Sequence, residues 1–468
     1  MIGCRHHLLR AVAIRCSGLV FTILLGAAAV AAVLLVGLSP RPAVSLPLYA
    51  RQTGQPCATC HTAFLELTPF GRRFKLGGYT LGGGDWSGPP FAVMLQPTFT
   101  HTQVGQEGGA APHFGPNNNF AMQQVSLFTG GRITDNLGAF IQGTYDGVAR
   151  RFGWDNTDIR YADQVNVGGH NLLWGVTANN NPTVQDVWNT IPAWRFPFIS
   201  PTLAPMPTAA PFIDEVYGQQ VAGLSAYTFL DDLLYLEFGG YRPLSTNTQL
   251  ALGVDTTGQS PISGVAPYWR LAFEPNFGDH SWEVGTFGLA SKVVPMRMSG
   301  AGTDSFTDIG IDTQYQYLGN PHTVTLRASW IRENHNTSAS QTLGLADNSN
   351  NNLRSLNVSA SYIYDHTWSF TAGRMSIGGT ADAALYGTFT GSPNSAGWIT
   401  EIAYLPFSYG GPTFWPWLNM RIGLQYTLWN KFDGATNNFN GAGRNAHNNN
   451  TIFAYAWISA PRPASQRT

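Results

Sequence analysis

From residue 91 to the C-terminus, apolar and polar residues alternate along the chain with a period of two. In residues 419–428 every even position is apolar, and every odd position is polar or glycine. The same alternation runs through 308–315, 323–330 and 355–362. A period of two places one apolar and one polar face on each strand, so it predicts a protein built from β-sheet. Both a half-buried soluble sheet and a transmembrane barrel give this pattern.

The lengths of the connections favour the barrel. About sixteen strand-like segments follow one another, and short connections alternate with long polar ones. The short connections are 134–136, 168–170, 230–232, 277–280, 319–322, 364–366 and 409–412, and the long ones include 103–117, 179–214, 243–265, 334–352 and 433–450. Bacterial outer-membrane barrels have an even number of strands, short periplasmic turns and long extracellular loops. A soluble sandwich has no reason to sort its loops in this way.

Aromatic residues gather at the ends of the predicted strands, as in the interfacial girdles of membrane barrels. They are Trp330, Tyr362, Tyr364, Trp368, Phe370, Trp415, Trp417, Trp429, Phe453, Tyr455 and Trp457. We therefore predict an all-β fold: a transmembrane antiparallel β-barrel of about 16 strands over residues 91–468. A small segment precedes the barrel.

The composition agrees with a surface that meets lipid. Charged residues make up 11% of the chain, whereas soluble domains carry about 25%. Much of the exterior is therefore expected to contact outer-membrane lipid. The net charge of -1 gives no sign of polyanion binding, so nucleic acid is not an expected partner.

Residues 1–45 are predicted to be an export signal peptide. Three arginines precede an uncharged apolar run at 17–40, and small residues suited to cleavage follow it. The run is also long enough to span a bilayer, so an uncleaved inner-membrane anchor is the alternative. Cleavage would remove Cys4 and Cys16, and the mature chain would then contain no disulfide.

Residues 46–90 hold the main candidate for chemistry. Cys57 and Cys60 are separated by two residues and His61 follows directly, which is the C-x-x-C-H attachment signature of a c-type haem. Each thiol can form a thioether with one haem vinyl group, and His61 is then placed to ligate the iron. A chance match or a disulfide is the alternative, but the chain has only four cysteines. We predict one covalently attached haem c, with Cys57 and Cys60 as thioethers and His61 as proximal iron ligand.

The sixth iron ligand is open. Met94 shares the parity of Ala92 and Gln96 on the first predicted strand, so it is expected to point into the lumen. A methionine opposite histidine raises the reduction potential of a haem, which suits a weakly reducing donor. Met94 is therefore a candidate distal ligand, with simple packing as the alternative. His101 and His113 are weaker candidates.

Three blocks around the motif carry a family resemblance. Residues 50–54 (ARQTG), 67–72 (LTPFGR) and 74–79 (FKLGGY), with C-x-x-C-H between the first two, span about thirty residues. This region, followed by a porin-like barrel, resembles the fused outer-membrane monohaem cytochrome-porins, a family that includes iron oxidases of iron-oxidising bacteria. The resemblance implies a single c-type haem segment fused to a barrel that passes electrons across the outer membrane. It does not fix the electron donor.

The remaining charged residues and histidines have both functional and ordinary interpretations. The basic residues Arg51, Arg72, Arg73 and Lys75 either pair with haem propionates or an acidic partner, or keep a small segment soluble. The turn histidines His170, His280, His322 and His366 are expected to be ordinary polar residues, with haem or proton-linked sites as the alternative. The lumen-facing set is predicted to form an ion-paired interior, with an Fe(II) site as the alternative: Glu237, Glu274, Asp308, Asp312, Glu401, Arg270, Arg327 and Arg421.

Together these features predict electron transfer across the outer membrane. An extracellular reductant, with Fe(II) as first candidate, would reduce the haem, and a soluble periplasmic cytochrome or another acceptor would take the electron. The chain would then be an Fe(II):cytochrome c oxidoreductase, with its haem segment at the periplasmic mouth or inside the lumen. The alternative is a porin for small solutes with a redox-responsive cytochrome plug. A peroxidase is a third hypothesis, but no distal acid-base set lies near the motif.

Overall fold

The fold is known from a computed structural model. It describes residues 48–63, 65–82, 91–191, 199–214, 217–413, 415 and 418–461. The predicted signal peptide at 1–45 lies outside these residues.

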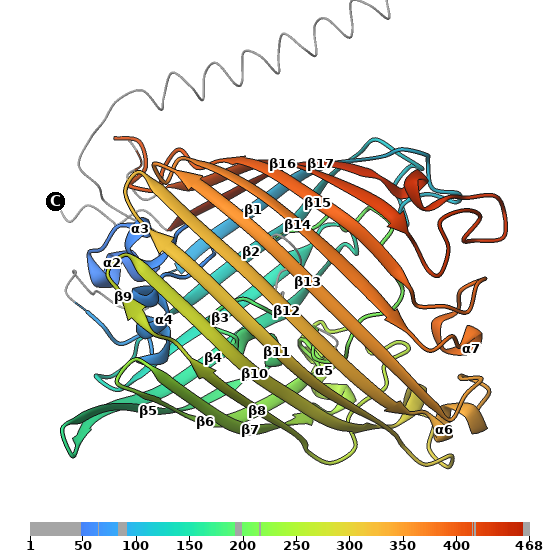
Figure 1. Cartoon of the computed structure of the whole chain (residues 1–468), viewed down its shortest axis with the longest axis horizontal. Coiled ribbons are helices and arrows are strands. Elements are labelled where there is room, and N and C mark those ends of the chain that lie inside the picture. The colour runs from blue at the N-terminus through green and yellow to red at the C-terminus, as the bar shows by residue number, and fades with distance from the viewer. Residues whose placement is uncertain are drawn as a thin grey trace, which may run out of the picture.

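Antiparallel strands close into a single barrel (Figure 1). The strands are β1 (Phe91–Thr102), β2 (Asn119–Arg132), β3 (Leu137–Asp146), β4 (Arg151–Val167), β5 (His170–Asn179), β6 (Val221–Leu230), β7 (Leu234–Pro243), β8 (Ala266–Phe273), β9 (Asn276–Phe277), β10 (His280–Val293), β11 (Asp304–Leu318), β12 (His322–Asn336), β13 (Asn350–Tyr364), β14 (Trp368–Gly379), β15 (Ser395–Tyr404), β16 (Asn419–Lys431) and β17 (Thr451–Pro461). The described residues give 17 segments in one sheet. Because β8 and β9 both pair with β10 as parts of one interrupted strand, the barrel has sixteen strands.

The predicted all-β barrel is confirmed, and its connections differ in length at the two ends. Strand β1 begins and strand β17 ends at the short-turn end. There Ala92 pairs with Pro461, and this pairing closes the barrel. The prediction of a short turn at 409–412 is wrong, because β15 ends at Tyr404 and β16 begins at Asn419. We refer to the two ends as the short-turn end and the long-loop end.

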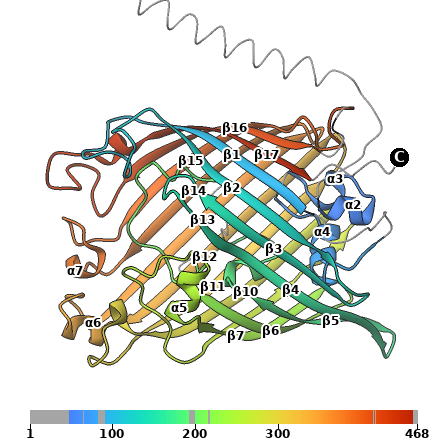
Figure 2. The same cartoon turned by 180° about the vertical axis from the view of Figure 1, so that it is seen from behind.

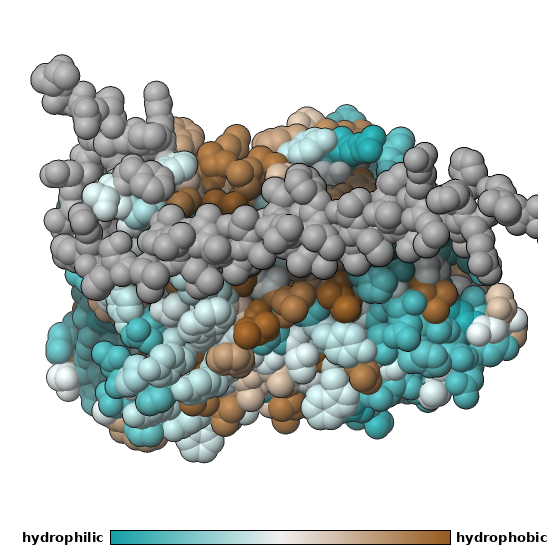
Figure 3. Space-filling view, turned by 90° about the horizontal axis from the view of Figure 1, so that it is seen from above, coloured by the Kyte–Doolittle hydropathy of each residue, from teal (hydrophilic) through white to brown (hydrophobic). Residues whose placement is uncertain are grey.

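The outside of the barrel is apolar and the inside is polar. Leu224 is 62% exposed and Phe238 is 67% exposed on the outer face, whereas Arg270 on the inner face is 1% exposed. On one face of the molecule, hydrophobic side chains gather between hydrophilic ends (Figure 3). A half-buried soluble sheet would bury its apolar face and expose its polar face. The opposite arrangement is that of a transmembrane barrel.

Ion pairs fill the inner face, as the sequence predicted. Arg270 Nη2 lies 2.5 Å from Asp312 Oδ2. Arg421 pairs with Glu401, and both side chains are at most 1% exposed. Buried charges need such partners because desolvation of an unpaired charge costs several kcal/mol.

The aromatic girdle is only partly as predicted. Tyr362, Tyr364 and Trp368 face outward at the short-turn end and are 36–46% exposed. Trp457 and Tyr455, by contrast, face the lumen with Phe453 and are at most 3% exposed. These three residues lie at odd positions of β17, opposite in parity to the outward Ile452.

Three short helices sit inside the short-turn end (Figures 1 and 2). They are α2 (Tyr49–Thr53), α3 (Cys57–Cys60) and α4 (Pro69–Leu76). We call residues 48–82 the haem segment, after the haem attachment predicted from their C-x-x-C-H motif. At the other end lie α5 (Thr246–Ala251), α6 (Ser338–Thr342) and α7 (Ala383–Tyr386). No helix of the described residues is long and apolar enough to span a membrane.

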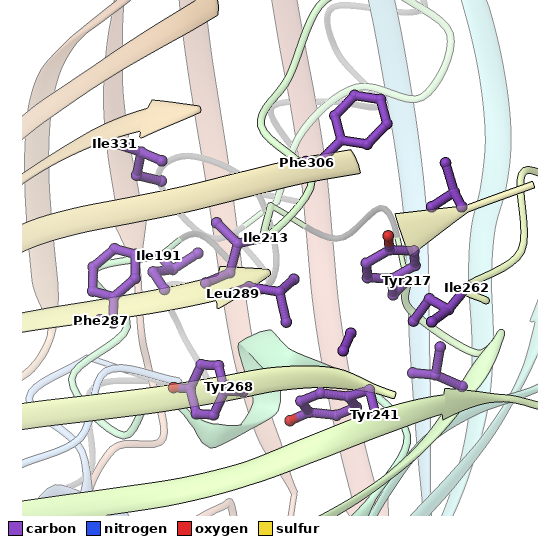
Figure 4. Packing of buried hydrophobic residues seen from close by; sticks show 13 residues of the cluster. Ile191, Ile213, Tyr217, Tyr241, Ile262, Tyr268, Phe287, Leu289, Phe306 and Ile331 are labelled. Carbon is purple, nitrogen blue, oxygen red and sulfur yellow. The ribbon is translucent and has the colours of Figure 1, made fainter. Parts of the chain in front are cut away.

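The connection between β5 and β6 enters the lumen. We call residues 180–220 the inward loop. Its Ile191 and Ile213 are at most 1% exposed, and they pack with wall residues such as Phe287 (Figure 4). The backbone N–H of Ile213 donates to Asp308 Oδ2 at 2.8 Å. The long connection predicted at 179–214 is present at the long-loop end, but it folds into the lumen, because its apolar side chains and backbone donors find partners on the inner wall.

Candidate haem site

The motif forms one helical turn that presents both thiols together. The spacing of Cys57 and Cys60 in α3 places them on one face of the helix, since residues three apart are neighbours on a helix surface. The His61 N–H donates to the Cys57 carbonyl at 2.9 Å and so ends the turn. The two thiols are not joined in a disulfide.

Helix α4 packs closely against this turn. Thr68 caps α4, because its Oγ1 accepts a hydrogen bond from Gly71 N at 3.1 Å. The Thr68 N–H donates to the Cys60 carbonyl at 3.0 Å. A Cβ placed on Gly71 would collide with the same Cys60 carbonyl oxygen. Gly71 is thus required for the close approach of α4 to the motif.

Gly71→Ala should loosen the motif. We expect the free energy of local opening of α3 and α4 to fall by about 1–3 kcal/mol, because an extra methyl group forces the two elements apart. Hydrogen-deuterium exchange of residues 57–76 measures this as faster exchange. Gly115→Ala is the control, since the nearest atom to its added Cβ would lie at 3.7 Å. Equal exchange in the two variants would contradict the close packing.

A cavity of about 260 Å³ lies beside the motif. Cys57, Cys60 and His61 line it together with Met94 from β1. Its other lining residues are mainly apolar and come from the haem segment, the barrel wall and the inward loop; they include Leu48, Leu65, Phe74, Phe128, Phe140 and Trp457. Residues from distant parts of the sequence therefore enclose one mainly apolar space.

The inward orientation of Met94 is confirmed. Its side chain is 2% exposed and packs with Trp457 and Phe453. Gln96 Nε2 donates to Met94 Sδ at 3.7 Å. Met94 and His61 therefore line the same cavity, as two ligands of one iron would have to do. The other two candidates, His101 and His113, belong to β1 near the long-loop end and to the first long loop, and neither lines the cavity.

The protonation state of the motif suits iron ligation. Burial lowers the pKa of His61 to about 4, so its imidazole is neutral at physiological pH. Only a neutral imidazole ligates a metal. Burial raises the pKa of the Cys60 thiol to about 12. The donors and the apolar lining thus fit a covalently attached haem c.

Two buried ion pairs fasten the haem segment to the barrel wall. Arg72 Nη2 lies 2.7 Å from Glu274 Oε1, and both side chains are at most 2% exposed. Arg327 Nη2 lies 2.8 Å from Glu66 Oε1. Arg72 also donates to Gln314 and Gln316 of β11. Neither of the two interpretations left open for Arg72 holds: Glu274 already neutralises it, and its side chain is too buried to make the segment soluble.

The other basic residues of the segment differ in environment. Arg73 forms a half-exposed ion pair with Asp232 at the rim. Lys75 lines the cavity, and burial lowers its pKa to about 8. Lys75 therefore remains a candidate partner for a propionate. The Arg51 side chain lies outside the described residues.

The turn histidines mostly have ordinary partners, as predicted. His170 Nδ1 lies 2.6 Å from Asp231 Oδ2. His280 and His322 hydrogen-bond the hydroxyls of Tyr315 and Tyr362. His366 differs, because its Nδ1 lies 3.4 Å from the Thr62 carbonyl of the haem segment.

The lumen carboxylates of the predicted set are already engaged. Glu274 accepts hydrogen bonds from Arg72 and from Trp188 Nε1 of the inward loop, the latter at 2.5 Å. Asp308 accepts the Ile213 N–H of the same loop. Among the described residues, no three His, Cys, Asp or Glu side chains are grouped as metal ligands would be. Glu274 therefore holds both the haem segment and the inward loop, and Asp308 holds the inward loop.

Several residues of the site were missed from the sequence. Trp457 lines the cavity, and Asn419 Nδ2 lies 3.6 Å from Cys57 Sγ. Trp188 of the inward loop contacts the barrel wall. Its neighbour Asn189 contacts the haem segment, because its Nδ2 donates to Leu65 O at 3.4 Å. The parity of β17 could have revealed Trp457. The many apolar residues of 180–220 could have indicated that this loop is buried, but not which residues it contacts.

No protein-family model and no curated protein sequence matches the chain. Solved structures with a similar fold include OmpF of Salmonella typhi in complex with daunomycin, at 14% identity, a TM-score of 0.47, and coverage of 80% of this chain and 97% of that one. OprB of Pseudomonas putida at high pH has 11% identity and a TM-score of 0.45, with coverage of 80% and 94%. An anion-selective porin from Comamonas acidovorans has 10% identity and a TM-score of 0.44, with coverage of 80% and 99%.

Proposed function

We propose that this chain transfers electrons across the outer membrane by means of one haem c bound to Cys57 and Cys60. The donor is an extracellular reductant, with Fe(II) as first candidate, and the acceptor is a periplasmic cytochrome or another soluble carrier. The observation that carries the proposal is the shared cavity: both thiols, His61 and Met94 line one apolar space inside the mouth of a membrane-type barrel.

Each of these residues has a distinct part. Cys57 and Cys60 would hold a haem covalently, His61 would ligate its iron as a neutral imidazole, and Met94 would offer a thioether as a further ligand. The bound haem would supply one-electron redox chemistry, and ligation by histidine and methionine would raise its potential. The apolar wall, including Trp457, excludes water from the ligands.

A polar cavity in the lumen lies beside the haem cavity and would serve a small ion that enters from the long-loop end. This second cavity, of about 600 Å³, is lined by polar side chains such as Gln96 and Asp155. Asn156 lines both this cavity and the haem cavity. Since the hydrocarbon layer is about 30 Å thick, a small ion that enters this space comes much closer to the haem site than one held outside.

The opposite side of the haem cavity faces the short-turn end. Gln55 lines the cavity and is exposed, and Gly54 beside it is exposed as well. A soluble acceptor that docks at this edge would therefore approach the haem without entering the barrel. Electrons would therefore leave the haem for the acceptor at this edge.

Sided reduction tests the function. Haem-loaded protein is inserted into liposomes with the long loops outside, and aqueous Fe(II), which as an ion does not cross the lipid, is added outside. We expect the visible spectrum to change to that of ferrous haem. Cys57→Ser/Cys60→Ser protein is the control and should give no spectrum. If neither Fe(II) nor any other impermeant reductant reduces the haem from the long-loop side, the electron-transfer proposal fails.

A porin with a redox-responsive plug is the second candidate. It is favoured by the contact between the plug and the lumen: Asn189 of the inward loop donates to Leu65 O of the haem segment at 3.4 Å. A shift of the segment on oxidation would therefore move the loop. This function predicts ion conductance that changes with haem redox state and no steady turnover with Fe(II).

A further inference from the structure

The polar cavity next to the haem site has the features of a cation site. Gln96 on β1 pairs across the sheet with Gln124 on β2, and Gln124 pairs with Asp146 on β3. Side chains opposite each other on adjacent strands have Cβ atoms about 4.5–5.5 Å apart. All three line the cavity of about 600 Å³, together with Asp155 on β4. Four neighbouring strands thus present oxygen donors to one space.

Two amide oxygens of this row have no hydrogen-bond partner among the described residues. They are Oε1 of Gln96 and Oε1 of Gln124. Gln96 is only 2% exposed, and its Nε2 is engaged by Met94 Sδ. A buried acceptor without a partner costs about 1–3 kcal/mol. A cation bound to the Gln96 Oε1 atom would satisfy this oxygen and would explain the orientation of the side chain.

The negative charge of Asp155 is not neutralised by a basic residue of the described chain. Its oxygens accept hydrogen bonds from Thr144 Oγ1 at 2.6 Å, Asn156 Nδ2 at 3.1 Å and Gln219 Nε2 at 3.2 Å, and all three donors are uncharged. Arg151, which also lines the cavity, pairs with Asp255 at 3.1 Å. The space therefore favours a positive charge.

We propose that Gln96, Gln124, Asp146 and Asp155 bind one hydrated divalent cation beside the haem cavity. Carboxylate and amide oxygens are the ligands of hard cations, and no histidine or cysteine lines this cavity to favour a softer metal. About 600 Å³ leaves room for a shell of waters, each of which takes about 30 Å³ in the liquid. Bound waters complete the coordination, because only two carboxylates are present.

The site deepens the proposed function, on which its role rests. Gln96 connects the two spaces, since it lines the cation cavity and donates to Met94 of the haem cavity. A reducing cation bound at this site would occupy the position next to the haem from which it gives up its electron. The binding itself is independent of the haem's reduction.

Manganese(II) is the probe, because its binding is followed by electron paramagnetic resonance without reducing the haem. We expect the haem-loaded full chain in detergent to bind one Mn(II) saturably. Asp155→Asn should weaken binding at least about tenfold, as expected for loss of about 1.4 kcal/mol. Gln96→Glu should tighten binding, because it adds a carboxylate in place of the orphan oxygen.

Glu237→Gln is the matched control. It removes a buried lumen carboxylate on β7 that hydrogen-bonds Tyr235 at 2.8 Å and does not line the cation cavity, so its affinity should equal that of the parent. No saturable binding by the parent overturns the site, and so does parent-like affinity in both Asp155→Asn and Gln96→Glu. Mn(II) binding without sided haem reduction would retain the site and reject the proposed electron transfer.

Discussion

Arg72→Met is expected to release the haem segment from the barrel. The substitution leaves Glu274 buried without a cation, and breaking a buried pair in this way costs about 3–5 kcal/mol. Of the two buried ion pairs that fasten the segment, only Glu66–Arg327 remains, so protease should cut residues 48–82 many times faster than in the parent. Limited proteolysis of the haem-loaded protein in detergent, followed by mass spectrometry, measures the rate.

The neighbouring arginine provides the control for this result. Arg73 pairs with Asp232, but the two side chains are 35% and 41% exposed. Surface pairs of this kind contribute about 0–1 kcal/mol, so Arg73→Met should be cut at nearly the parental rate. Adding Glu274→Gln to Arg72→Met should restore part of the protection, because it removes the stranded charge. Slow cleavage of Arg72→Met would contradict the role of the pair.

Met94→Leu is expected to lower the reduction potential of the haem. Loss of a thioether ligand opposite His61 favours the ferric state. The fall should exceed about 60 mV, which is a tenfold change for one electron. Leucine has nearly the volume of methionine, so stability should change by less than about 1.5 kcal/mol. Spectroelectrochemical titration of the purified protein gives the potential.

Met122→Leu is the control for the ligand assignment. Met122 lies on β2 and faces outward with 40% exposure, so its replacement should leave the potential unchanged. The absorption band of methionine-ligated ferric haem should disappear in Met94→Leu alone. An unchanged potential and spectrum in Met94→Leu would mean that another group completes the iron.

The wall of the barrel was predictable because each strand repeats a simple physical rule. Alternation every two residues assigned Met94 and Arg270 to the inner face, and both are buried there. The same rule applied to β17 would have placed Trp457 inside. The aromatic composition of this strand end is also that of an interfacial girdle, so composition and parity point to opposite faces for Trp457.

The contents of the barrel were less predictable, because they depend on contacts between distant residues. The partner of Arg72 is Glu274, 202 residues along the chain, and no local pattern links them. The inward loop contains many apolar residues, and Trp188 and Ile191 within it are at most 1% exposed, but no local pattern shows which wall residues they contact. The local motif predicted the thiols and His61, whereas the cavity that surrounds them required the fold.

The mass of the exported protein tests the central claim most directly. We predict that the mature chain carries the added mass of one haem, and that after digestion this mass stays on the peptide that contains both Cys57 and Cys60. The Cys57→Ser/Cys60→Ser protein should carry none and should still form the barrel. A mature parent chain without haem, or with haem on another peptide, would contradict the account.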